Sequence, residues 1–176
     1  YNRVPYFDET ASVADIEAIS NVALTSSELW DKIAGDFRFA VDNLPELQSD
    51  KGRPDKYTAK AYLAKVLLYQ SYEQDENYNV GNINKTKLQE VVDLVDEVIG
   101  SGHYRLTGDF AENFLYEYEN GPETVWSIQR SHNDGTLTGN LDFSAMLSGP
   151  MSNEYGCCWF HIPSQNLVNA FKTDAT

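Results

Sequence analysis

The sequence predicts an all-α fold of antiparallel helix pairs, followed by a long irregular loop region that includes a short strand segment. Two observations support the helical part. Apolar residues recur every three or four positions over 26–44, 56–74 and 84–100, and residues that start or stop helices stand at the ends of these stretches. A third observation supports the irregular part, since glycines and prolines interrupt every period from about 130 to 163.

The first helix has the clearest start. Thr25-Ser26-Ser27-Glu28 has the form of a capping box, in which the Thr hydroxyl accepts an early helix amide and the Glu reaches back. Pro45 then ends the helix because it cannot continue the hydrogen-bond pattern. Between these limits the apolar positions follow helical spacing: Leu29, Ile33, Phe37, Val41 and Leu44.

Two further helices follow, one after the Gly52-Arg53-Pro54 turn and one after a polar loop with Asn77, Asn79, Gly81 and Asn82. Small residues in the second helix allow a neighbour to approach closely, which favours antiparallel pairing with the first. We expect Ala59, Ala61 or Ala64 near the crossing. The side chains expected to be buried together are Phe37, Val41, Tyr62, Leu63 and Val66.

The chain beyond Gly102 changes character. A short helix is expected over 109–115, and the alternation over 123–129 indicates a short strand or extended segment. Residues 130–163 are expected to form a long loop, and Ser164 is expected to cap a last helix. Trp30 and Trp126 are interpreted as structural, because each lies in an apolar pattern.

Composition excludes several classes of function. With 27 acidic and 13 basic residues the net charge is −14, which disfavours nucleic acid as a partner. No apolar run reaches the roughly 20 residues of a membrane-spanning helix. The adjacent Cys157 and Cys158 do not suit an ordinary disulfide, and the widely spaced His103, His132 and His161 predict no metal site. No cofactor is expected.

Several short elements occur in the order found in one family. Three elements resemble the SusD/RagB family. They are the helix end Phe39–Pro45, the Gly52-Arg53 turn with the helix that follows it, and Ile99–Leu106, which has the form "I-x-S-G-x-Y-x-L". The remaining similar elements are Val4-Pro5-Tyr6, Phe114, the stretch 120–129 and Pro163–Phe171. The spacing of the first two helices is also compatible with a tetratricopeptide-like pair.

The resemblance implies a SusD-like α-α superhelix and a carbohydrate-binding, nutrient-uptake lipoprotein. Such a protein is exposed at the surface of the outer membrane, touches the membrane only through a lipid anchor outside this segment, and delivers oligosaccharides or polysaccharides to a SusC-like TonB-dependent transporter. Because family members are larger, the chain is expected to be an internal portion of a SusD/RagB-like domain. Residues 1–176 are expected to form a single segment, with a helical part at 26–102 and a loop-rich part at 103–176.

Sugars need flat rings to stack on and polar groups for their hydroxyls. Trp159, Tyr155, Asn153 and Glu154 combine both in the long loop and are the predicted carbohydrate-binding residues. The alternative interpretation is that Trp159 only covers the end of the core.

Two other functions stay open at this point: a protein-interaction scaffold and a glycoside hydrolase. A peptide-binding scaffold would carry its unpaired aromatic rings on the inner helical faces, whereas a glycan binder would carry them on loops. No catalytic motif is recognised, and no catalytic residue is predicted.

Overall fold

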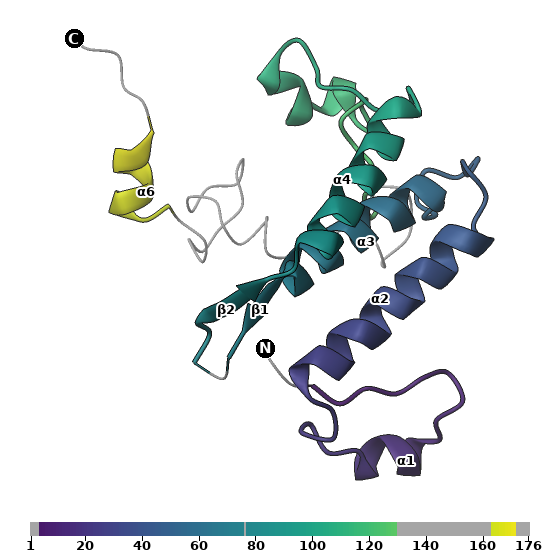
Figure 1. The fold of residues 1–176 in the computed structure, drawn as a ribbon. Coiled ribbons are helices and arrows are strands. Elements are labelled where there is room, and N and C mark those ends of the chain that lie inside the picture. Colours follow the sequence, from purple (N-terminus) through teal and green to yellow (C-terminus); the bar gives the residue numbers. More distant parts are fainter. Residues whose placement is uncertain (1–3, 76, 130–162, 172–176) are drawn as a thin grey trace, which may run out of the picture. The chain divides into compact units, whose positions relative to one another are not determined.

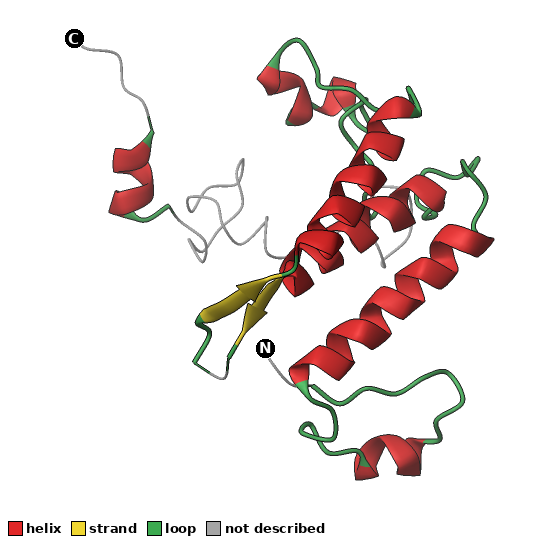
Figure 2. Ribbon diagram, viewed as in Figure 1, coloured by secondary structure: helices red, strands yellow, loops and turns green. Residues whose placement is uncertain are grey.

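The computed structural model describes residues 4–75, 77–129 and 163–171. In chain order the elements are α1 (Val13–Ala18), α2 (Ser26–Asn43), α3 (Lys56–Ser71), β1 (Tyr72–Gln74), β2 (Val80–Ile83), α4 (Lys85–Gly100), the 3₁₀ helices η1 (Phe110–Asn113) and η2 (Tyr116–Tyr118), and α6 (Gln165–Ala170) (Figure 1). The described part is mostly helical with one small hairpin, as Figure 2 shows, so the predicted fold class is confirmed. The chain divides into two compact units, Tyr1–Ser127 and Ile128–Thr176. The predicted division into a helical part and a loop-rich part stays a prediction.

Helix α2 begins where the capping box predicts. The Thr25 hydroxyl accepts the Glu28 amide at 3.3 Å, and the Glu28 carboxylate accepts the Thr25 amide at 2.8 Å. These hydrogen bonds hold the pKa of Glu28 below its usual range. The helix ends at Asn43, one residue before the predicted limit. A second capping box, formed by Ser12 and Asp15, starts the short α1, which the periodicity did not predict.

Helix α3 lies between α2 and α4 and contacts both (Figure 1). Trp30 near the start of α2 stacks on Tyr69 near the end of α3, with ring centroids 5.8 Å apart. Phe37, later in α2, stacks on Tyr62, earlier in α3, at 5.6 Å. The order of these contacts is that of an antiparallel pair, as predicted.

The core lies on both faces of α3, because the helices on its two sides leave little of it in water. Leu63 is 2% exposed, and the predicted Ala64 and Val66 are buried beside it. The predicted burial of Tyr62 is wrong: its ring is 38% exposed, because it lies at the edge of the α2–α3 seam and stacks there on Phe37. The buried cluster consists of Ala34, Leu63, Ala64, Val66, Leu67 and Leu94.

The predicted limit of α3 at residue 74 is wrong, and the predicted polar loop after it is a β-hairpin. Helix α3 ends at Ser71, whose carbonyl accepts the Asn84 amide at 2.8 Å. The next residues pair as an antiparallel ladder in which Tyr72 lies opposite Ile83. The Asp75 carboxylate closes the tip by accepting backbone amides, including that of Asn79 at 2.9 Å. This local bonding competes with continuation of the helix.

The segment from 103 to 129 also departs from expectation in part. Within the predicted short helix over 109–115 the structure has one 3₁₀ helix, η1, and a second, η2, follows beyond that range. Residues 123–129 are not a strand, because their polar groups bond to α3 and its preceding loop: the Val125 carbonyl accepts the Thr58 hydroxyl at 3.3 Å. The segment instead contains a turn at Glu123 and a bend at Val125.

The last described element confirms one prediction. The Ser164 hydroxyl accepts the Leu167 amide at 3.2 Å and so caps α6. The predicted long loop over 130–163 lies outside the described residues, apart from Pro163. Among the helices that the structure describes, none is both long enough and apolar enough to span a bilayer.

Candidate functional site

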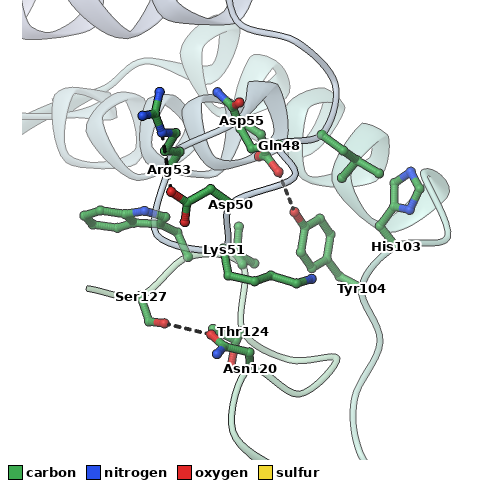
Figure 3. A pocket seen from close by; sticks show the side chains of 13 residues that line it. Gln48, Asp50, Lys51, Arg53, Asp55, His103, Tyr104, Asn120, Thr124 and Ser127 are labelled. Atoms are coloured by element: carbon green, nitrogen blue, oxygen red, sulfur yellow. Dashed lines mark hydrogen bonds and ion pairs between the residues drawn. The ribbon is translucent and has the colours of Figure 1, made fainter. Parts of the chain in front are cut away.

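A polar pocket lies where three loop segments meet at one end of the helices. The α2–α3 loop, the residues after α4, and the segment 120–127 each contribute a wall, and the cavity measures about 190 Å³ (Figure 3). Such a volume accommodates one small ring rather than a whole oligosaccharide. Its principal lining side chains are Gln48, Lys51, Tyr104, Asn120, Thr124 and Trp126.

Asp55 holds one side of the pocket. As the N-cap of α3, it is buried and accepts the amide and the hydroxyl of Thr58, at 2.8 and 2.9 Å, through one carboxylate oxygen. The other oxygen accepts the Tyr104 hydroxyl at 3.5 Å (Figure 3). Burial and then the nearby Asp55 charge raise the pKa of Tyr104 to about 12. Tyr104 therefore stays a neutral hydroxyl at any physiological pH.

Trp126 forms the opposite wall. Its indole N–H donates to the Gly52 carbonyl at 3.1 Å, and its ring meets Tyr62 edge-on at 6.1 Å. These contacts hold the ring at the edge of the cavity, where Trp126 is half-buried. Figure 3 shows the Lys51 side chain extending across the pocket toward Tyr104. The pocket thus presents a fixed aromatic surface and a cation side by side.

A tight turn shapes the third wall. Asn120 has a φ of 57°, and a Cβ on Gly121 would lie 2.9 Å from the Tyr118 carbonyl oxygen, so this position requires glycine. The Ser127 hydroxyl donates to the Asn120 side chain at 3.3 Å. Together these features point the Asn120 amide toward the cavity beside Thr124 (Figure 3).

Hydrogen bonds between residues 105–107 and residues 122–123 hold this wall in place. The Arg105 amide donates to the Pro122 carbonyl at 3.1 Å. The Glu123 carboxylate accepts the Thr107 amide at 2.7 Å and its hydroxyl at 2.9 Å, and these bonds hold the pKa of Glu123 below its usual range.

The pocket is suited to binding a polar ligand. Amide, hydroxyl and ammonium groups can donate and accept hydrogen bonds around a half-exposed ring. Its carboxylates are already engaged, because Asp50 pairs with Arg53 at 3.5 Å and Asp55 caps α3. Within the described ranges, no cluster of three or more His, Cys, Asp or Glu side chains is arranged to hold a metal ion.

The predicted carbohydrate-binding residues Asn153, Glu154, Tyr155 and Trp159 all lie outside the described residues. Trp126, interpreted as structural, is both a packing residue and a pocket wall. Sequence reasoning missed Lys51 and Asn120. The available signal was topological: with three consecutive antiparallel helices, the loop after the first and the loop after the third lie at the same end.

No family model matches the chain. A SusD-like protein of Bacteroides ovatus is 29% identical over 137 residues, which cover 75% of this chain and 23% of that protein. The chain therefore spans about a quarter of the length of this curated relative.

Two solved structures share the fold. One, a complex with a xylogluco-oligosaccharide, is 29% identical with a TM-score of 0.53, and the match covers 61% of this chain and 21% of that one. The other is a SusD-like protein of Bacteroides fragilis, 21% identical with a TM-score of 0.58, and the match covers 76% of this chain and 24% of that one.

Proposed function

Because this chain is similar in sequence to SusD-like proteins, we propose that it is part of a glycan-binding component of an outer-membrane polysaccharide uptake system. The component captures oligosaccharides at the cell surface and delivers them to a TonB-dependent transporter of the SusC type. Its attachment to the membrane is a lipid anchor outside this segment.

One observation carries the proposal: a structure 29% identical to this chain holds a xylogluco-oligosaccharide. The pocket adds a chemical reason. Sugars offer C–H faces to aromatic rings and hydroxyl rims to amides and charged groups. Trp126 supplies the ring, while Lys51, Asn120 and Thr124 supply the hydrogen-bonding groups. We therefore propose this pocket as one contact point for the glycan, beside the predicted Trp159 and Tyr155.

The distribution of aromatic rings supports a glycan over a peptide. On the α2–α3 faces Tyr69 stacks on Trp30 and Tyr62 stacks on Phe37, so these rings already pair with one another. The three most exposed rings of the described residues, Tyr116, Phe110 and Phe114, lie after α4, and Phe39 on α2 follows at 70%. A tetratricopeptide-like scaffold for peptides would leave the helical rings unpaired instead.

We propose that the protein binds without catalysis. A glycoside hydrolase needs one carboxylate as acid and a second as base or nucleophile. In the pocket, Asp50 pairs with Arg53 and Asp55 serves as a helix cap. Incubation with a bound polysaccharide between pH 4 and 8 should release no reducing ends. Hydrolysis that disappears on changing a single Asp or Glu would contradict this.

The direct test begins with a glycan array on the full-length protein, followed by calorimetric titration of the glycans that bind. Lys51→Ala should weaken binding about three- to tenfold, because one charged hydrogen bond to a hydroxyl is lost. Trp159→Ala and Tyr155→Ala test the predicted loop site in the same titration. Lys65→Ala is the matched control, since Lys65 is exposed on α3 and does not line the pocket. Binding to no glycan on the array would overturn the proposed function.

A further inference from the structure

The turn that carries Lys51 is fixed beside the pocket. Asp50 closes the turn, since its carboxylate accepts the Gly52 amide at 3.0 Å and its carbonyl accepts the Arg53 amide at 3.1 Å. The Gly52 carbonyl in turn accepts the Trp126 indole N–H at 3.1 Å. Lys51 therefore stands between two bonded residues, and its side chain extends across the pocket (Figure 3).

The charged groups around the cavity differ in whether they are neutralised. The Asp50 carboxylate pairs with Arg53 at 3.5 Å. The Asp55 carboxylate is buried, and one of its oxygens accepts bonds at the start of α3 while the other accepts the Tyr104 hydroxyl. Within the part of the chain that the structure describes, Lys51 has no ion pair, although the sequence holds 27 acidic and 13 basic residues. The cavity is thus lined by an ammonium group that lacks a counterion.

The size and the donors of the cavity limit what can pair with this ammonium group. At about 190 Å³ the cavity accommodates one small ring. Lys51 and Thr124 line it with an ammonium and a hydroxyl group, which both donate hydrogen bonds. A carboxylate or a sulfate ester only accepts hydrogen bonds and also supplies the missing negative charge. A sugar hydroxyl supplies no charge and leaves the ammonium group without a counterion.

The net charge of −14 does not oppose a single acidic group at this position. At physiological ionic strength, exposed charges more than about 8 Å apart are largely screened from one another. The groups that line the cavity therefore decide the interaction, and among them the charge of Lys51 is the unpaired one in the described chain.

We infer that the pocket selects a sugar unit that carries one acidic group, with Lys51 as its counterion and Trp126 beside its ring. The glycan that the protein captures then contains uronate or sulfated units. The inference rests on the proposed glycan-binding function and adds the charge of the unit that the pocket holds.

The test compares methyl glycosides in matched pairs on the full-length protein, by ligand-observed NMR titration. The pairs are glucuronate with glucose, galacturonate with galactose, and glucose 6-sulfate with glucose, so that the arms distinguish a carboxylate from a sulfate ester. In the wild type, at least one acidic sugar should bind about five- to thirtyfold more tightly than its neutral partner, because it gains a charged hydrogen bond at a partly exposed site. Raising the salt from about 0.1 M to about 1 M should reduce this preference and leave the neutral sugar unaffected.

Variants at Lys51 separate its charge from its bulk. Lys51→Met keeps the length of the side chain and removes the charge, so the acidic sugar should lose more affinity than the neutral one and the two should bind alike. Lys51→Arg keeps the charge and should retain most of the preference. Lys65→Met is the matched control, since Lys65 is exposed on α3 and does not line the pocket. The melting temperature should stay close to that of the wild type in all three, because Lys51 is exposed as well.

The possible outcomes separate the two proposals. Equal binding, or none, within every pair would overturn the acidic selectivity, while the glycan-binding function stands if glycans still bind on the array. An equal loss for both members of a pair in Lys51→Met would also overturn it, because Lys51 would then act only as a hydrogen-bond donor to hydroxyl groups. If the full-length protein binds no glycan on the array, both proposals are wrong.

Discussion

The helices α2 to α4 and the segment 103–127 are held together by different forces. In the helices, apolar side chains on the faces of α3 are buried against its two neighbours, with ion pairs such as Arg38 with Glu90 and Lys60 with Glu97 only at the edges. In the segment, side-chain hydrogen bonds add to a few ring contacts such as Trp126 with Tyr62: Trp126 donates to Gly52, the Thr107 amide to Glu123 and Tyr104 to Asp55.

This difference indicates a division of roles. Apolar packing resists change throughout the helical region, because each buried residue has many partners. A wall held by a few hydrogen bonds can present polar groups and rings to solvent without losing its shape. The rigid helices thus position a polar surface that they do not themselves contain. Four predictions test this comparison, from the largest expected effect to the smallest.

Leu63→Ala should have the largest effect, lowering the free energy of unfolding by about 2–5 kcal/mol, because it leaves a cavity in the core. Leu68→Ala, five residues along the same helix, is the matched control, since Leu68 is 41% exposed. Chemical denaturation of both variants gives the comparison. Equal effects would mean that α3 does not have a buried face at Leu63.

Asp55→Ala should cost about 1–2 kcal/mol, because α3 loses its cap. It also removes the acceptor of the Tyr104 hydroxyl, so the spectrophotometric pKa of Tyr104 should fall from about 12 toward the usual tyrosine value. Asp55→Asn keeps a capping oxygen and should lose less stability. If the pKa of Tyr104 is unchanged in Asp55→Ala, the hydrogen bond between the Tyr104 hydroxyl and Asp55 is wrong.

Trp126→Phe should cost about 1 kcal/mol, since it removes the hydrogen bond to Gly52 but keeps a ring against Tyr62. The expected loss is smaller than for Leu63→Ala, as the comparison requires. Thermal unfolding followed by circular dichroism would detect it. A loss as large as that of Leu63→Ala would place Trp126 in the core instead.

The smallest effect concerns pH. The pKa of Glu123 is depressed in the folded state, so its bonds to Thr107 stabilise the third wall of the pocket above the unfolded pKa and are lost as pH falls through the folded value. Amide hydrogen exchange at Thr107 should therefore show less protection below about pH 4. In Glu123→Gln the Thr107 amide should already be less protected at neutral pH, and its protection should not fall further below about pH 4. A wild-type profile with the same pH dependence as that of Glu123→Gln would contradict the assignment.

The helical region was predictable because its signals are local. Thr25 and Glu28 identify the start of α2 within four residues, and Pro45 marks its end. The residue order of Ile99–Leu106, with the other short elements, indicated the SusD-like family that the relatives support. The end of α3 was harder to predict from the sequence. Tyr72 continues the helical period in sequence, and only pairing with Ile83 across the hairpin makes it a strand residue.

The sequence by itself determined the starts of α2 and α3, the burial of Leu63 and the acidic net charge, because periodicity, caps and charge are properties of neighbouring residues. Only the tertiary structure decided that Lys51, Tyr104 and Asn120 share one pocket. These residues lie far apart in the chain, and no local signal connects them. Their meeting depends on the antiparallel order of three helices and on a turn at Gly121 that allows no side chain. Long-range packing, which a single sequence does not reveal, therefore created the candidate site.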